Sequence, residues 1–156
     1  LIIMNTALGL GTGAGDGFNA WKQYALTVPD FDAGQIIARG TPEMGEAEIA
    51  AYNAPYPDDS YQAGARTFPA LVPVEPDMDG VAVSQQAAAF WSSEWSGPSF
   101  MAIGGSDPVL GPPVMKIMHS LINGCPEPLL IEEAGHFVQE WGDIVAPAAL
   151  KAFGDV

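Results

Sequence analysis

A histidine and an aspartate each follow a short apolar segment of this sequence. Asp107 comes after residues 100–103 (FMAI), and His136 comes after residues 129–131 (LLI). Continuous apolar runs of this length are typical of strands buried on both faces of a parallel sheet. Neighbouring parallel strands end at the same edge of a sheet, so we expect the two side chains to meet there. A carboxylate on one imidazole nitrogen fixes the tautomer and leaves the other nitrogen to act as a general base.

Each of these residues alone also has an ordinary structural interpretation. Asp107 precedes Pro108, and Asp-Pro is common in turns; His136 follows Gly135 and fits a helix N-terminus. An acid and then a histidine at successive strand ends favour a catalytic pair over two unrelated turn residues. His119 falls within a predicted helix, and we assign it no role.

Trp21 is the third candidate for a functional residue. On a predicted helix it shares a face with Phe18 and Ala25, so core packing is the simpler interpretation. The functional interpretation is that its indole N–H, in an apolar pocket, donates a hydrogen bond to a halide or another small anion.

A nucleophile for the predicted pair is not evident in the sequence. The motif Gly-x-Ser-x-Gly does not occur, and no Ser, Cys or Asp lies in an evident strand–turn–helix elbow. In the chain order of α/β-hydrolases the nucleophile comes first, so it would precede Leu1. The chain also opens on an apolar run rather than on Met. We therefore interpret it as a fragment that is inactive alone.

An open α/β sheet would position these residues. Apolar runs at 1–4, 100–103 and 129–131 predict three strands, and helical spacing from Pro112 to residue 122 predicts a βαβ unit between the last two. A further helical pattern covers residues 137–153. Gly142-Asp143 suggests a new helix start there, which would place Pro147 in a first turn, where proline is tolerated.

Residues 5–99 separate the first two strands and are too many for a simple crossover. The alternating glycines of residues 9–17 do not fit a dinucleotide-binding motif and predict a flexible hinge. The helices predicted after them run from a cap at Asp16 to Pro29, from a cap at Asp32 to Gly40, from Glu46 to Tyr52, and from Ser84 to Trp95.

The composition excludes several classes of partner. The 156 residues include 19 acidic and 5 basic side chains, for a formal net charge of −14. Such a chain repels nucleic acid and anionic membranes, so we expect neither as a partner. One cysteine and two distant histidines form no metal-binding pattern, so we expect no metal. No run is long enough to span a bilayer and no signal peptide is evident, which predicts a soluble cytoplasmic protein.

Several segments resemble the haloalkane dehalogenases, a family of capped α/β-hydrolases. The resemblance covers nearly the whole chain and is closest to the subfamily whose triad acid follows the seventh strand and whose halide lies between two tryptophans. The segments that carry it are 18–22 (FNAWK), 54–58 (APYPD), 61–64 (YQAG), 100–104 (FMAIG), 125–129 (CPEPL) and 133–140 (EAGHFVQE).

The resemblance implies the C-terminal half of an α/β-hydrolase fold with an inserted helical cap. Residues 1–8 would be the sixth strand of the core, residues 9–83 the cap with its hinge, and residues 84–156 the C-terminal part of the core. His136 would activate water, Asp107 would orient His136, Trp21 would donate to the halide, and Phe18 would line the substrate pocket. The nucleophilic Asp would lie outside this chain.

The resemblance also implies the partners and the reaction. A small haloalkane would be hydrolysed to an alcohol and a halide ion through an alkyl-enzyme ester, without a cofactor or a metal, by a full-length protein that we expect to be a monomer. Two alternatives stay open from the residues alone. One is another capped α/β-hydrolase, such as an epoxide hydrolase or an esterase, and the other is an inactive truncated chain.

Overall fold

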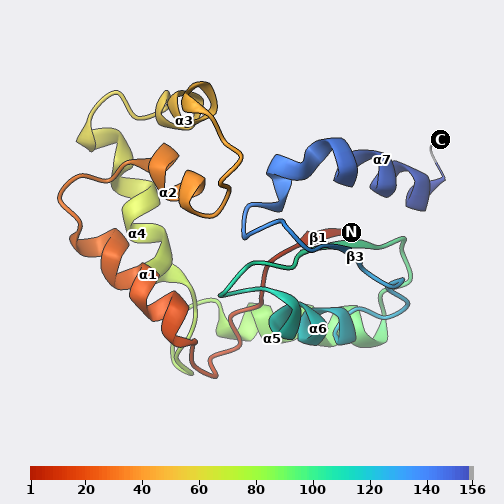
Figure 1. Ribbon diagram of the computed structural model, residues 1–156. Coiled ribbons are helices and arrows are strands. Elements are labelled where there is room, and N and C mark those ends of the chain that lie inside the picture. The colour runs from red at the N-terminus through yellow and green to blue at the C-terminus, as the bar shows by residue number, and fades with distance from the viewer. Residues whose placement is uncertain (155–156) are drawn as a thin grey trace. The chain divides into compact units, whose positions relative to one another are not determined.

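The computed structural model describes residues 1–154, which form two compact units (Figure 1). The first, here called the core unit, comprises Leu1–Leu8 and the chain from Ala82 onward. The second, the helical unit, comprises Gly9–Val81. The predicted insert comprised residues 9–83, and its role as a cap stays a prediction.

The core unit is built on a three-stranded parallel sheet. Its strands are β1 (Ile2–Met4), β2 (Phe100–Gly104) and β3 (Leu129–Ile131), in the order β1-β2-β3. In the register of the sheet, Ile3 lies beside Met101. These strands agree with the three predicted apolar runs, and the α/β fold class is confirmed.

All five residues of β2 are buried because helices cover both faces of the sheet. In Figure 1, α7 (Gly142–Phe153) lies on one side of the strands, and α5 (Val81–Ser93) and α6 (Pro112–Ser120) lie on the other. This two-sided burial explains why the β2 sequence is a continuous apolar run rather than an alternating one.

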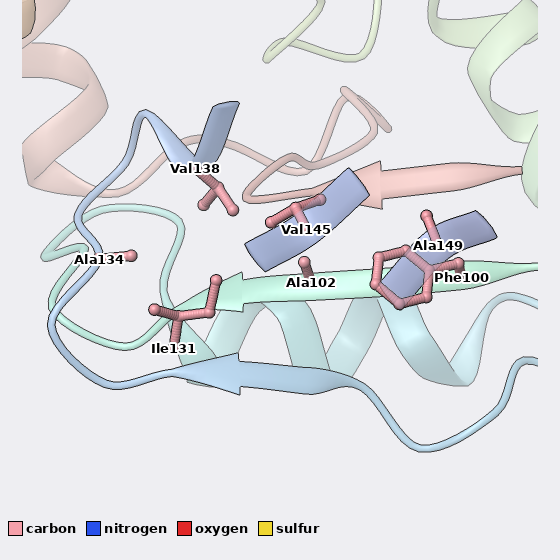
Figure 2. Close-up of a cluster of buried hydrophobic side chains, with 7 residues drawn as sticks. All are labelled: Phe100, Ala102, Ile131, Ala134, Val138, Val145 and Ala149. Carbon is pink, nitrogen blue, oxygen red and sulfur yellow. The ribbon is translucent and has the colours of Figure 1, made fainter. Parts of the chain in front are cut away.

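Successive side chains of β2 point to opposite faces of the sheet and enter different hydrophobic clusters. Phe100 and Ala102 pack with Val145 and Ala149 of α7, as Figure 2 shows. The other face has its own cluster, formed by Ile3, Met101, Ile103, Met115, Met118 and Ile122, with Trp91 of α5 packed against it.

Helices α6 and α7 differ in how they use proline. Pro112 and Pro113 occupy the first turn of α6, as predicted. The prediction for Pro147 was wrong: α7 begins at Gly142, which puts Pro147 in the second turn. Pro147 and Asp143, four residues before it, are both exposed, so water can bond the Asp143 carbonyl that the proline leaves unpaired. A 3₁₀ turn, η2 (Val138–Trp141), precedes the helix.

The helical unit contains four α-helices and a 3₁₀ turn among its described residues. They are α1 (Asp16–Thr27), α2 (Ala33–Arg39), α3 (Glu46–Asn53), η1 (Asp59–Gln62) and α4 (Ala63–Leu71). The N-cap of α2 is Asp32, as predicted, and its carboxylate accepts a hydrogen bond from the Gln35 N–H at 2.8 Å. The predicted cap of α1 was wrong by one residue: Gly15 is the N-cap, and Asp16 lies in the first turn, where its charge favours the helix dipole.

The glycine-rich run is held by backbone hydrogen bonds within the helical unit. Gly11 N–H donates to the Pro73 carbonyl at 3.1 Å, and Gly13 N–H donates to the Val74 carbonyl at 2.8 Å. Both glycines have a positive φ, of 75° and 91°, that side chains rarely adopt. The run therefore has a defined conformation at these positions, and its use as a hinge stays a prediction.

Among the described helices, none has the length and apolar character that crossing a membrane requires.

Candidate functional site

The structure brings Asp107 and His136 together at the C-terminal ends of β2 and β3. His136 Nδ1 lies 2.8 Å from Asp107 Oδ2. The Asp107 side chain is fully buried, whereas the His136 side chain is 41% exposed. The pair therefore has a sheltered acid and an accessible imidazole.

Four hydrogen bonds converge on the Asp107 carboxylate. Its Oδ1 accepts from the N–H groups of Val109 at 2.8 Å and Leu110 at 3.1 Å, and its Oδ2 accepts from His136 and, at 2.9 Å, from Asn5. Burial by itself would raise the pKa of Asp107, but these bonds outweigh burial and lower the pKa from 3.8 to about 2. The carboxylate is therefore ionised at every physiological pH.

An ionised Asp107 fixes the tautomer of His136. A carboxylate only accepts hydrogen bonds, so the proton of the neutral imidazole must lie on Nδ1. Nε2 then carries a lone pair, and within residues 1–154 this atom has no hydrogen-bond partner. Because the side chain is 41% exposed, this nitrogen can take a proton from water, which is the chemistry of a general base.

Asn5 is a third polar residue of this site, and the sequence analysis missed it. It follows β1 directly, is only 4% exposed, and donates from Nδ2 to Asp107 Oδ2 at 2.9 Å and to the Gly104 carbonyl at 3.2 Å. Its Oδ1 accepts from the Gly104 N–H at 2.8 Å. The strand-end rule that identified Asp107 and His136 applies equally to Asn5 and would have identified it.

Two glycines allow the backbone to approach closely around the pair. A β-carbon at Gly104 would collide with the Gly135 carbonyl oxygen, and one at Gly111 would collide with the Asp107 carbonyl oxygen. The atoms in the way belong to the backbone, so they cannot rotate aside as a flexible side chain could. Gly104 thus sets the position of the loop that carries His136.

We expect Gly104→Ala to destabilise the core unit by roughly 1–3 kcal/mol, because the added methyl group overpacks a tight backbone contact. The same change should displace His136 and perturb its imidazole resonances. Urea denaturation and NMR of the histidine side chains would measure the two effects.

Gly64→Ala is the matched control. Gly64 lies in α4 with no atom within 4 Å of an added β-carbon. Alanine in a helix interior is favoured over glycine, so this variant should be as stable as the parent or slightly more so. Equal behaviour of the two variants would contradict the positioning of His136 by Gly104.

Trp21 and Phe18 belong to α1 of the helical unit and are both partly exposed. The Trp21 ring is stacked on Tyr24 with centroids 6.0 Å apart and is tilted against the buried Phe31 at 6.2 Å. Within residues 1–154, its indole N–H donates no hydrogen bond. Trp21 is therefore anchored by its ring while its N–H stays available.

A hollow of about 210 Å³ in the helical unit contains none of the four predicted site residues. Its acidic lining disfavours an anion, so it does not suit a halide. The lining residues are Asp30, Phe31, Asp32, Asn53, Tyr56, Asp59 and Gln62. Within residues 1–154, no group of three or more His, Cys, Asp or Glu side chains is arranged to hold a metal ion.

Comparisons with known proteins identify the class to which this core belongs. No family model matches the sequence. A haloalkane dehalogenase from Psychrobacter cryohalolentis is 40% identical over 145 residues, which cover 90% of this chain and 47% of that protein. A haloalkane dehalogenase from Mycobacterium marinum is 37% identical over 126 residues, covering 79% of this chain and 41% of the relative.

Solved structures of haloalkane dehalogenases also match this chain. The structure of haloalkane dehalogenase DpaA from Paraglaciecola agarilytica NO2, described as tetrameric, matches 97% of this chain and 51% of its own chain, with a TM-score of 0.92 and 41% identity. The haloalkane dehalogenase DbeA from Bradyrhizobium elkani USDA94 matches with a TM-score of 0.69 at 16% identity, which shows a shared fold.

The parallel sheet covered on both faces, with Asp107 and His136 at successive strand ends, is part of an α/β-hydrolase core. The chain is homologous to haloalkane dehalogenases, to which it is 37–41% identical over the aligned residues. It spans about half the length of the curated relatives it matches, as the C-terminal part of such an enzyme would.

Proposed function

We propose that this chain supplies the acid–base pair and one halide donor of a haloalkane dehalogenase. The observation that carries the proposal is the 2.8 Å hydrogen bond between Asp107 and His136, which leaves Nε2 of a half-exposed imidazole available. The similarity to haloalkane dehalogenases supports a reaction for this pair in which a base must activate water. The proposal takes residues 1–8 as the sixth strand of the core and the helical unit as the cap.

In the proposed reaction, a nucleophilic Asp outside this chain attacks the carbon that bears the halogen. A C–O bond forms, the carbon–halogen bond breaks with its electron pair leaving on the halide, and an alkyl ester results. Water then gives a proton to His136 Nε2 and attacks the ester carbonyl. The C–O bond to the alkyl group's oxygen breaks, the leaving alkoxide takes the proton back from His136 to become the alcohol, and the carboxyl group loses its own proton to solvent. Asp107 stabilises the imidazolium that forms in this second step.

Trp21 is proposed to stabilise the halide as it leaves. Its contacts with Tyr24 and Phe31 use the ring and not the indole N–H, and an N–H donor in an apolar setting favours a small anion. The packing against Tyr24 and the buried Phe31 would hold the donor in one orientation. Phe18, one helical turn before Trp21, is proposed to line the substrate pocket.

We expect Trp21→Phe in the complete enzyme to weaken bromide binding by roughly 10- to 100-fold, because a hydrogen bond to a charged group contributes about 1.5–3 kcal/mol. Isothermal calorimetry with sodium bromide would measure the change. Phenylalanine keeps an aromatic ring against Tyr24 and Phe31, so the helical unit should still fold.

Trp91→Phe provides the control for Trp21. Trp91 lies on α5 and packs against the buried cluster of the core unit, so its replacement should leave bromide affinity unchanged. Unaltered bromide affinity in the Trp21 variant would refute the halide role of Trp21.

The monomeric state and cytoplasmic location of the full-length protein stay predictions.

A further inference from the structure

The segments that follow three neighbouring strands each carry a polar side chain, and hydrogen bonds join the three side chains. Asn5 follows β1, Asp107 follows β2, and His136 belongs to the loop after β3. Asn5 and His136 both donate to the same oxygen, Asp107 Oδ2, at 2.9 and 2.8 Å. The carboxylate is thus held between two side-chain donors from the strands on either side of it.

The orientation of the Asn5 amide is fixed by the backbone of β2. Its Oδ1 accepts from the Gly104 N–H at 2.8 Å, and its Nδ2 donates to the Gly104 carbonyl at 3.2 Å. A flipped amide would direct an NH₂ group at an N–H donor and lose both bonds. Nδ2 must therefore face Asp107, and Asn5 acts there only as a donor.

We propose that Asn5 is a positioning residue for the acid–base pair: its Nδ2–H fixes the plane of the Asp107 carboxylate and so directs Oδ2 at His136 Nδ1. The backbone N–H groups of Val109 and Leu110 hold the other oxygen, Oδ1. With both oxygens held, the carboxylate cannot rotate, and a single tautomer of His136 is favoured. The catalytic consequence of this inference rests on the proposed function, whereas the geometry does not.

A purely structural role is the competing explanation, since Asn5 also bonds both polar backbone groups of Gly104. That role depends on bonds to β2 and would affect stability alone. A positioning role depends on the bond to Asp107 and must also affect how that carboxyl titrates and which imidazole nitrogen carries the proton. Measuring stability, the Asp107 titration and the His136 tautomer together therefore distinguishes the two roles.

Among the residues that the structure describes, His136 and Glu132 are titratable groups near this carboxyl. His136 donates to it directly. Glu132, just after β3, has its Oε2 3.2 Å from the position of a β-carbon at Gly105, close to the same strand end. Both are retained in the variants below, so their effects on the Asp107 titration are shared.

The test uses the 156-residue chain with carbon-13 in its Asp carboxyl groups and nitrogen-15 in its histidine rings. In the parent chain, we expect the Asp107 carboxyl to stay ionised down to about pH 3 and neutral His136 to be the Nδ1–H tautomer. Asn5→Ala removes the donor. The Asp107 titration midpoint should then rise by about one pH unit, and the Nε2–H tautomer of His136 should become detectable.

Asn5→Asp keeps the shape of the side chain and an oxygen that can accept from the Gly104 N–H. It therefore provides a second test if Asn5→Ala does not fold. It places a second carboxylate against Asp107 Oδ2, and two such groups cannot both ionise easily. The pair should share a proton with an upper apparent pKa at least two units above that of Asp107 in the parent. Below that upper pKa, the shared proton forms a hydrogen bond between the two carboxyl groups, in place of the bond that Asn5 Nδ2 donates to Asp107 Oδ2 in the parent.

Asn123→Asp is the matched control. Asn123 is exposed and donates to the Trp95 carbonyl, away from the pair in the hydrogen-bond network, so its change should leave both readouts as in the parent. The inference is overturned if the two Asn5 variants lower the melting temperature but leave the Asp107 midpoint and the His136 tautomer unchanged. A shifted Asp107 midpoint and a changed His136 tautomer would support the inference even if the complete enzyme released no halide. A failure of the inference can therefore be distinguished from a failure of the proposed function.

Discussion

His136→Gln in the complete enzyme will stop turnover and leave a single equivalent of halide per active site. Formation of the ester needs the nucleophile outside this chain and a halide donor, but not a base. Hydrolysis of the ester needs His136 Nε2, the atom that the bond to Asp107 leaves available. Loss of a general base costs roughly 10²–10⁴-fold in rate, so the alkyl-enzyme should accumulate. Ion chromatography of halide and intact-mass spectrometry would follow the two products.

His119→Gln is the control for this experiment. His119 lies in α6, and its Nε2 contacts the carbonyls of Cys125 and Pro126 within 3.0 Å, so it is occupied in a structural contact. Turnover should survive this change. If His136→Gln releases halide continuously at the parental rate, the assignment of the base is wrong.

Asp107→Asn should lower the rate of ester hydrolysis by roughly 10³–10⁴-fold, comparable to the loss on replacing a triad acid with its amide. The amide oxygen would face the N–H groups of Val109 and Leu110, which leaves its NH₂ group directed at His136 and Asn5. His136 would then have to present a lone pair on Nδ1 and carry its proton on Nε2. That tautomer cannot accept a proton from water. Single-turnover kinetics would measure the loss.

Asp107→Asn should also change how the free energy of unfolding depends on pH. The pKa of Asp107 is lowered from 3.8 to about 2, so folding favours its ionised form. This stabilisation, about 2 kcal/mol, is complete above pH 4 and is lost as the pH falls towards 2. The parent should therefore exceed Asp107→Asn in free energy of unfolding at pH 7, and the gap should narrow in acid. A gap that does not change between pH 7 and pH 3 would contradict this account of Asp107.

The parts of the fold that follow from simple sequence patterns were predicted well. The run 100–103 is continuously apolar because α6 and α7 cover opposite faces of β2, and such two-sided burial leaves a clear pattern. The prolines at the start of α6 have an equally direct physical meaning. The meeting of Asp107 with His136 followed from parallel topology alone.

The features that were missed depend on tertiary contacts. The position of Asn5 directly after a predicted strand could have marked it as a candidate, but its bond to Asp107 depends on the alignment of the three strands. Helix α4 was not predicted, and its Pro69 is a residue that local propensity disfavours inside a helix. Pro147 is tolerated in the second turn of α7 because that part of the helix faces solvent, which no local pattern reveals. The roles of Trp21 and Phe18 rest on resemblance and stay predictions.

The most direct test of the account is the product of the gene read in frame from upstream of Leu1, incubated with a short bromoalkane. We predict equal amounts of bromide and alcohol in many turnovers, and their loss in His136→Gln. An enzyme that releases no bromide but hydrolyses p-nitrophenyl acetate would contradict the account, because Asp107 and His136 would then serve an esterase.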